Sequence, residues 1–88
     1  MRVKVRLFGS LRPVNAPGEI EVELPVDSKM IDLIETLSKD YPEVAGTLRN
    51  TSMRLIMLGG IEVGNLEGLE TKISEGSEVV LVPVTHGG

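Results

Sequence analysis

The sequence predicts an α+β fold in which one principal helix packs on one face of a mixed β-sheet. Three observations support this prediction. Two segments near the N-terminus alternate apolar and charged residues, as half-buried strands do. A segment with a helical apolar stripe follows them. The last segment, residues 78–84, is apolar at almost every position, which is typical of a central strand buried on both faces.

The first two strands are expected over residues 2–8 and 19–24. In RVKVRLF the inward face is apolar and the outward face is basic, whereas in EIEVEL the outward face is acidic. The intervening SLRPVNAPG is rich in Pro, Asn and Gly, which favours a hairpin loop. Opposite charges on the two outward faces suit antiparallel neighbours.

A helix is expected next, with Asp27 or Ser28 as its N-terminal cap. Its apolar residues recur at spacings of three and four positions, which places them on one face. They are Met30, Leu33, Ile34 and Leu37. The Tyr41-Pro42 step ends this helix, because the residue before a proline avoids helical geometry.

The second half of the chain is less regular. Residues 43–52 are expected to form a loop or a short, poor helix, and residues 54–58 a third strand that stops at a Gly-Gly pair. Residues 61–75 are irregular, with room for one short strand. A hairpin, a helix and a last strand in the middle of the sheet make up the β-grasp arrangement that ubiquitin uses. We therefore predict a ubiquitin-like β-grasp domain over residues 1–83 and a C-terminal tail over residues 84–88.

Composition excludes several functions. The chain has no cysteine, which removes disulfides, iron–sulfur clusters, thiolate zinc sites and thiol catalysis. A net charge of −4 argues against binding to nucleic acid. No apolar run approaches the ~20 residues of a membrane helix, and basic residues interrupt the N-terminal apolar positions where a signal peptide would lie. We expect a cytoplasmic protein that contacts neither membrane nor nucleic acid and binds no metal or cofactor.

No catalytic constellation is evident. The single histidine, His86, is followed by only two glycines, in a tail where nothing fixed can orient it as a general base. The carboxylates are spaced as on the outer faces of strands and a helix. We therefore expect a protein without catalysis of its own.

An apolar patch is expected on the face of the sheet that the helix leaves uncovered. Phe8 is out of phase with its strand, since it falls on the basic face. If Val79 and Leu81 point toward the helix, the alternate residues of the last strand point away from it, namely Val80, Val82 and Val84. An exposed apolar patch framed by charge usually marks a partner site. The alternative is that Phe8 merely ends its strand and curls over the edge.

The chain ends in VTHGG. Five residues from position 84 span about 16 Å at strand spacing, which is long enough to enter a narrow channel in another protein. Glycine has no Cβ, so such a channel can close around the backbone. We expect His86 and Gly87 to thread the channel and the carboxyl of Gly88 to be the reactive group, as an acyl-adenylate. The alternative is a chance ending with no chemistry.

Three stretches, VKVRLFGSLR, SKMIDLIETLSKDYP and SEGSEVVLVPVTHGG, resemble the ubiquitin-like sulfur carriers, most of all the small subunit of molybdopterin synthase (MoaD-like). Ser77 replaces the usual Asp, and Val84 stands where a second proline is common. The resemblance implies that an E1-like adenylyltransferase uses ATP and magnesium to adenylate Gly88, which then becomes a thiocarboxylate. It also implies that the tail enters the molybdopterin synthase large subunit, and that Phe8, Val82 and Leu66 face the partner.

Other interpretations stay open at this point. The acceptor of the sulfur could be another enzyme, because tRNA thiolation and thiamine synthesis use related carriers. The HGG ending is also common in the ubiquitin-related modifier of tRNA thiolation, and conjugation to proteins belongs with that interpretation. A β-grasp interaction module whose terminal glycines do no chemistry is an alternative of a different class.

Overall fold

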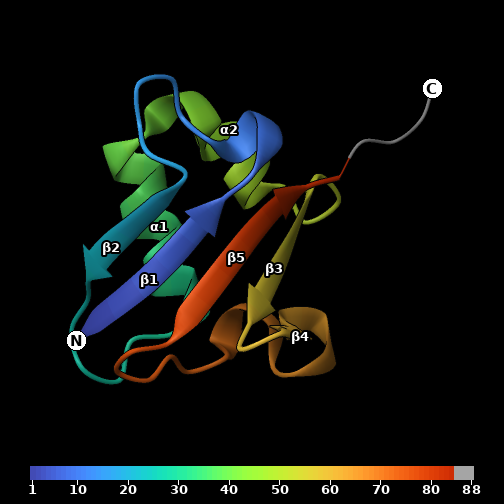
Figure 1. Cartoon of the computed structure of the whole chain (residues 1–88). Helices are drawn as coiled ribbons and strands as arrows, with labels where there is room; N and C mark the ends of the chain where they lie inside the picture. The colour runs from blue at the N-terminus through green and yellow to red at the C-terminus, as the bar shows by residue number, and fades with distance from the viewer. Residues whose placement is uncertain (85–88) are drawn as a thin grey trace.

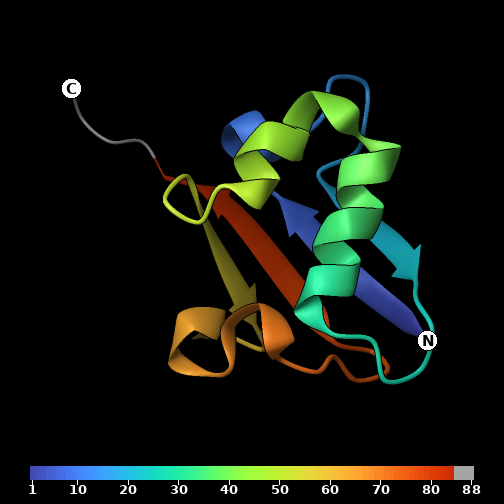
Figure 2. The ribbon, with the colours of Figure 1, turned by 180° about the vertical axis from the view of Figure 1, so that it is seen from behind.

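The computed structural model describes residues 1–84, and in it a five-stranded mixed sheet carries one principal helix on one face (Figures 1 and 2). The strands lie in the order β2-β1-β5-β3-β4. Their bounds are β1 Arg2–Leu7, β2 Glu19–Glu23, β3 Arg54–Leu58, β4 Ile61–Glu62 and β5 Glu78–Pro83. The central strand β5 runs parallel to β1 and antiparallel to β3. This is the ubiquitin-like β-grasp arrangement, so the predicted fold class is confirmed.

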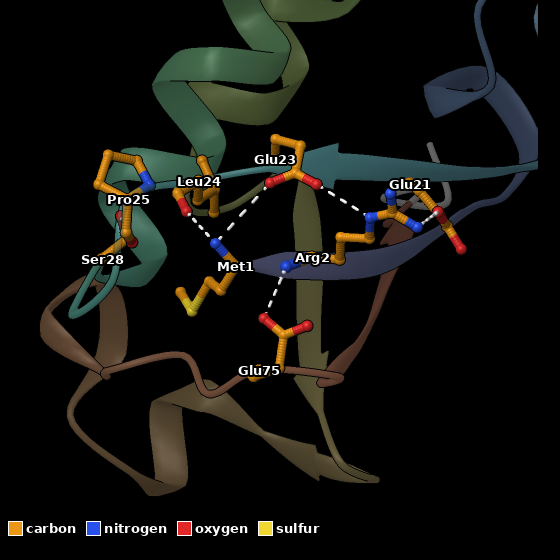
Figure 3. A network of polar contacts seen from close by, with 8 residues as sticks. All are labelled: Met1, Arg2, Glu21, Glu23, Leu24, Pro25, Ser28 and Glu75. Carbon is orange, nitrogen blue, oxygen red and sulfur yellow. Dashed lines mark hydrogen bonds and ion pairs between the residues drawn. The ribbon is translucent and has the colours of Figure 1, made fainter.

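The hairpin of β1 and β2 pairs opposite charges in register. Arg2 lies opposite Glu23, and the two other basic residues of β1 also face glutamates. Arg2 Nε lies 3.0 Å from Glu23 Oε1, and the Arg2 backbone N–H donates to Glu75 Oε2 at 2.8 Å (Figure 3). The α-amino group of Met1 donates to the Leu24 carbonyl at 2.7 Å in the same network. These contacts fix the N-terminal end of the hairpin, and the register confirms the antiparallel pairing that the charge pattern predicted.

Helix α1 (Met30–Asp40) packs across the back of the sheet (Figure 2). The four apolar residues of its predicted stripe are at most 1% exposed: Met30, Leu33, Ile34 and Leu37. They meet the inward side chains of the strands in one continuous core. The helix ends as predicted, with Tyr41 as its C-cap before a proline.

The predicted helix cap was wrong. The N-cap is Lys29, whose backbone N–H donates to the Asp32 carboxylate at 2.8 Å. Asp27 has a φ of 70°, a left-handed conformation that aspartate tolerates better than most residues. The Ser28 hydroxyl donates to the Pro25 carbonyl at 2.7 Å. Both candidate caps are therefore part of a tight turn ahead of the helix.

Short elements connect the rest of the chain. A 3-10 turn, η2 (Pro42–Val44), leads into the five-residue helix α2 (Ala45–Arg49), so of the two expectations for residues 43–52, a loop or a short helix, the structure has the short helix. Further 3-10 turns are η1 (Gly9–Leu11), η3 (Val63–Asn65) and η4 (Gly68–Glu70). Within the described part of the chain, no helix is long and apolar enough to cross a membrane.

Among residues 1–84, Arg54 is the one charged residue that is buried. Its Nε donates to the Leu48 carbonyl at 2.9 Å, which ties the start of β3 to the end of α2. Burial lowers the pKa of the Arg54 guanidinium, and the carboxylate of Glu62 opposes that shift. The interaction serves the packing of α2 on the sheet.

Candidate functional site

Strand β5 has one face in the core and one face free of the helix. Val79 and Leu81 are fully buried, whereas the intervening Val80 and Val82 are half-buried. Side chains alternate across a strand, so the two sets lie on opposite faces of the sheet. Figure 1 views the face that carries Val80 and Val82, with the helices behind. We call it the open face.

Phe8 extends this open face from β1. Its side chain is 48% exposed. Its backbone is extended, with φ −114° and ψ 153°, and its N–H donates to the Leu81 carbonyl at 3.1 Å. The ladder between β1 and β5 thus continues past Leu7, and Phe8 lies beside Val82. The predicted exposure of Phe8 is confirmed, and the extended backbone keeps the side chain in phase with the basic face of β1.

Strand β3 adds two apolar residues that sequence reasoning missed. Leu55 pairs with Val82, and Met57 pairs with Val80. Directly paired residues share a face of a sheet, so both belong to the open face, where Leu55 is 41% exposed. The stretch RLIML has no polar residue at its outward positions to mark that face. We define the open-face patch as Phe8, Leu55, Met57, Val80 and Val82.

Charged side chains occupy the other half of the open face. The basic residues of β1 and the glutamates of β2 form ion pairs there, among them Lys4 Nζ with Glu19 Oε1 at 3.3 Å. A hydrogen bond with Glu23 and the nearby charge of Glu21 raise the pKa of Arg2. The apolar patch over β5 and β3 is therefore bordered by charge on the side of β1 and β2, as predicted.

Leu66 lies outside the open-face patch. It follows η3 and is 43% exposed, and the pocket that it lines contains Lys29 and Glu70 but no member of the open-face patch. Lys29 Nζ lies 2.6 Å from Glu70 Oε2, and this hydrogen bond raises the pKa of Lys29. The structure thus does not bring Leu66 together with Phe8 and Val82, and its predicted contact with a partner stays a prediction.

The C-terminal tail begins at the same end of the sheet as Phe8. Val84 is half-buried, and its N–H donates to the Met53 carbonyl at 2.9 Å. The predicted threading residues His86 and Gly87 and the predicted reactive Gly88 lie outside the described residues. Within residues 1–84, no group of three or more His, Cys, Asp or Glu side chains could hold a metal ion.

The fold and the patch together define a ubiquitin-like domain with an uncovered apolar surface next to its C-terminal end. The ThiS family profile matches residues 5–88. That match covers most of the chain, and the protein belongs to the ThiS family.

Two relatives and one solved structure refine this assignment. A molybdopterin synthase sulfur carrier subunit from Phaeosphaeria nodorum is 32% identical over 73 residues, which cover 81% of this chain and 76% of that protein. The small archaeal modifier protein 3 of Haloferax volcanii is 26% identical over 92 residues and is covered completely, as is this chain. The solution structure of the Haloferax volcanii HVO 2177 protein has a TM-score of 0.85 and 26% identity, over 100% of this chain and 87% of that one.

These relatives are a carrier and a modifier rather than catalytic enzymes. The protein is accordingly a ThiS/MoaD-like sulfur carrier or ubiquitin-like modifier, and the expectation that it is not itself an enzyme is confirmed by its kinship.

Proposed function

We propose that this protein is a sulfur carrier whose Gly88 carboxyl is adenylated and converted to a thiocarboxylate, and that it donates this sulfur in molybdopterin synthesis. The observation that carries the proposal is the family match, which runs through residue 88. The sulfur carrier subunit from Phaeosphaeria nodorum supports the molybdenum pathway.

The chemistry takes place at the end of the chain and in a partner. A carboxylate is a poor electrophile. An E1-like adenylyltransferase, using ATP and magnesium, would join the Gly88 carboxylate to AMP and release pyrophosphate. Hydrosulfide, as the sulfur nucleophile, would then form a C–S bond as the C–O bond to AMP breaks, so that AMP leaves and the thiocarboxylate remains. In this proposal the carrier's part is to present Gly88 to the enzymes that perform these steps.

The open-face patch is the proposed docking surface for these partners. Phe8 and Leu55 are large apolar side chains, each more than two-fifths exposed, and such exposure has no role in folding the domain. Burial of aromatic anchors at the centre of an interface supplies much of its binding energy. The E1-like enzyme and the molybdopterin synthase large subunit, or another sulfur acceptor enzyme, would bind here and receive the tail. The proposal places these encounters in the cytoplasm.

A second function is favoured by a separate observation. The small archaeal modifier protein 3 matches this chain over its full length. A modifier would use the same adenylated Gly88, but a lysine amine of a target protein would attack it and form an isopeptide bond. The two functions share activation and differ in the nucleophile.

The first step can be tested by ATP–pyrophosphate exchange with the cognate activating enzyme. The full chain should support exchange, and a chain that lacks Gly88 should support none while keeping its melting temperature. Exchange that is equally fast with the truncated chain would contradict the proposal and favour an interaction module without C-terminal chemistry.

The choice of acceptor needs a second reaction. Chain carrying the thiocarboxylate should return to the carboxylate when the molybdopterin synthase large subunit and its pterin precursor are added. In a parallel reaction the carboxylate form is incubated with the activating enzyme, ATP and a candidate target protein, and a product heavier by the mass of that target would identify the modifier function instead.

A further inference from the structure

The last residues of β5 are held by a neighbouring element on each side. A Cβ built on Gly9 would lie 3.0 Å from Pro83 Cγ, so η1 and the end of β5 are in close contact. On the other side of β5, the Val84 N–H donates to the Met53 carbonyl at 2.9 Å. We call these two contacts the tail-start clamp. They fix the chain up to the residue that precedes positions 85–88.

The first contact depends on glycine. Gly9 has a φ of +52°, in the left-handed region that other L-residues adopt with strain. Any side chain at this position would also press on the Pro83 ring. Gly9 directly follows Phe8, so the clamp is adjacent in sequence to the open-face patch.

We propose that the tail-start clamp positions the tail: it fixes the direction in which residues 85–88 leave the sheet when the patch is docked on a partner. This inference rests on the proposed function. Four residues at strand spacing reach about 13 Å, so a tail that starts at a fixed point could deliver a carboxyl about that far from Val84. A start that moves would spread the carboxyl over a larger volume and lower its effective concentration in the partner's active site.

The clamp can be opened from either side. Gly9→Val places a branched side chain against Pro83. Gly59→Val is the matched control, because Gly59 has a φ of +57° and no atom within 4 Å of a built Cβ; it carries the same backbone strain without the contact. A semisynthetic chain with an ester in place of the Pro83–Val84 amide removes the Val84 donor and leaves every side chain intact.

Each chain is assayed with the cognate activating enzyme for affinity, measured without ATP, and for kcat and KM of adenylation. Amide hydrogen exchange of Val84 reports the clamp directly in the two valine variants. We expect Gly9→Val and the ester to lower kcat about tenfold or more, as small displacements of a reacting group do, with affinity within about twofold. Gly59→Val should change neither. Gly9→Val should also speed exchange at Val84.

The outcomes separate this inference from the proposed function. Wild-type chain that is never adenylated overturns both. Wild-type chain that is adenylated, together with an ester and a Gly9→Val variant of unchanged kcat, overturns the positioning role alone. Equal losses in Gly9→Val and Gly59→Val, with the ester at wild-type rate, would assign the loss to backbone strain and also overturn it. If Gly9→Val does not fold, the ester decides.

Discussion

On the face of the sheet that α1 covers, Val5, Val79 and Leu81 are 0% exposed. On the open face of the sheet, the apolar residues Phe8 and Leu55 remain more than two-fifths exposed. Burial stabilises the domain by roughly 25 cal/mol per Å² of apolar surface, so the first face accounts for folding. The second face keeps apolar surface in water beside the start of the tail. The difference in exposure shows that the face under α1 forms the core, and it supports the proposal that the open face serves docking.

The largest loss of stability is expected from a substitution in the core between α1 and the sheet. Leu33→Ala removes a side chain that is 0% exposed and should lower the free energy of unfolding by about 2–5 kcal/mol. Chemical denaturation measures this loss. Retention of wild-type stability would mean that α1 does not depend on its apolar stripe.

Phe8→Asp should weaken partner binding strongly and change the stability of the domain little. A charge on the open-face patch should weaken binding to the activating enzyme by about 2 kcal/mol or more and change stability by about 0.5 kcal/mol at most. Calorimetric titration and thermal unfolding check the two effects. Val26→Asp is the control, since Val26 is 77% exposed but lies beside the start of α1, outside the patch. A large loss of stability in Phe8→Asp would place Phe8 in the core.

Leu55→Asp tests whether the docking surface extends from β5 onto β3. Leu55 lies at its β3 side, opposite Val82, so the variant should weaken binding by about 1 kcal/mol, less than Phe8→Asp, because aromatic side chains dominate interface energetics and leucine is under-represented among hot spots. Titration with the same enzyme measures this. Unchanged affinity would confine the docking surface to β1 and β5.

The smallest change in stability is expected from Lys29→Gln, at a position away from the open-face patch. Its half-exposed side chain pairs with Glu70, and that hydrogen bond raises the pKa of Lys29. A raised folded-state pKa stabilises the protein below the unfolded pKa and loses that contribution as the pH rises through the folded value. The stability difference between wild type and Lys29→Gln should therefore be small at pH 7 and disappear at strongly alkaline pH. Unfolding curves at several pH values test this, and a difference that persists would assign it to packing.

Much of the fold could be predicted because the sequence alternates polar and apolar residues clearly. The facing charges of β1 and β2 and the stripe of α1 each specify one orientation. The helix cap could not be predicted, because Asp27 and Ser28 are good caps and good turn residues alike, and the tertiary bond from the Met30 N–H to the Thr71 carbonyl, 2.8 Å, favours a later start.

The candidate site was predicted in part, for a related reason. Phe8 and Val82 were found because one broke an alternation and the other belonged to an apolar strand. Leu55 and Met57 were missed, because a continuous apolar run does not reveal which residues face outward until its pairing with β5 is known. The contact between Gly9 and Pro83 joins residues far apart in the chain, so no local sequence pattern could predict it.

The central claim is that the chain acts through the carboxyl of Gly88. Intact mass measurement of the protein after incubation with the cognate activating enzyme, ATP and a sulfur donor tests it most directly. The account predicts a gain equal to the mass difference between one sulfur and one oxygen atom, carried by the C-terminal fragment and absent from a chain without Gly88. An unchanged mass with a fully active enzyme, or the same gain in the truncated chain, would contradict it.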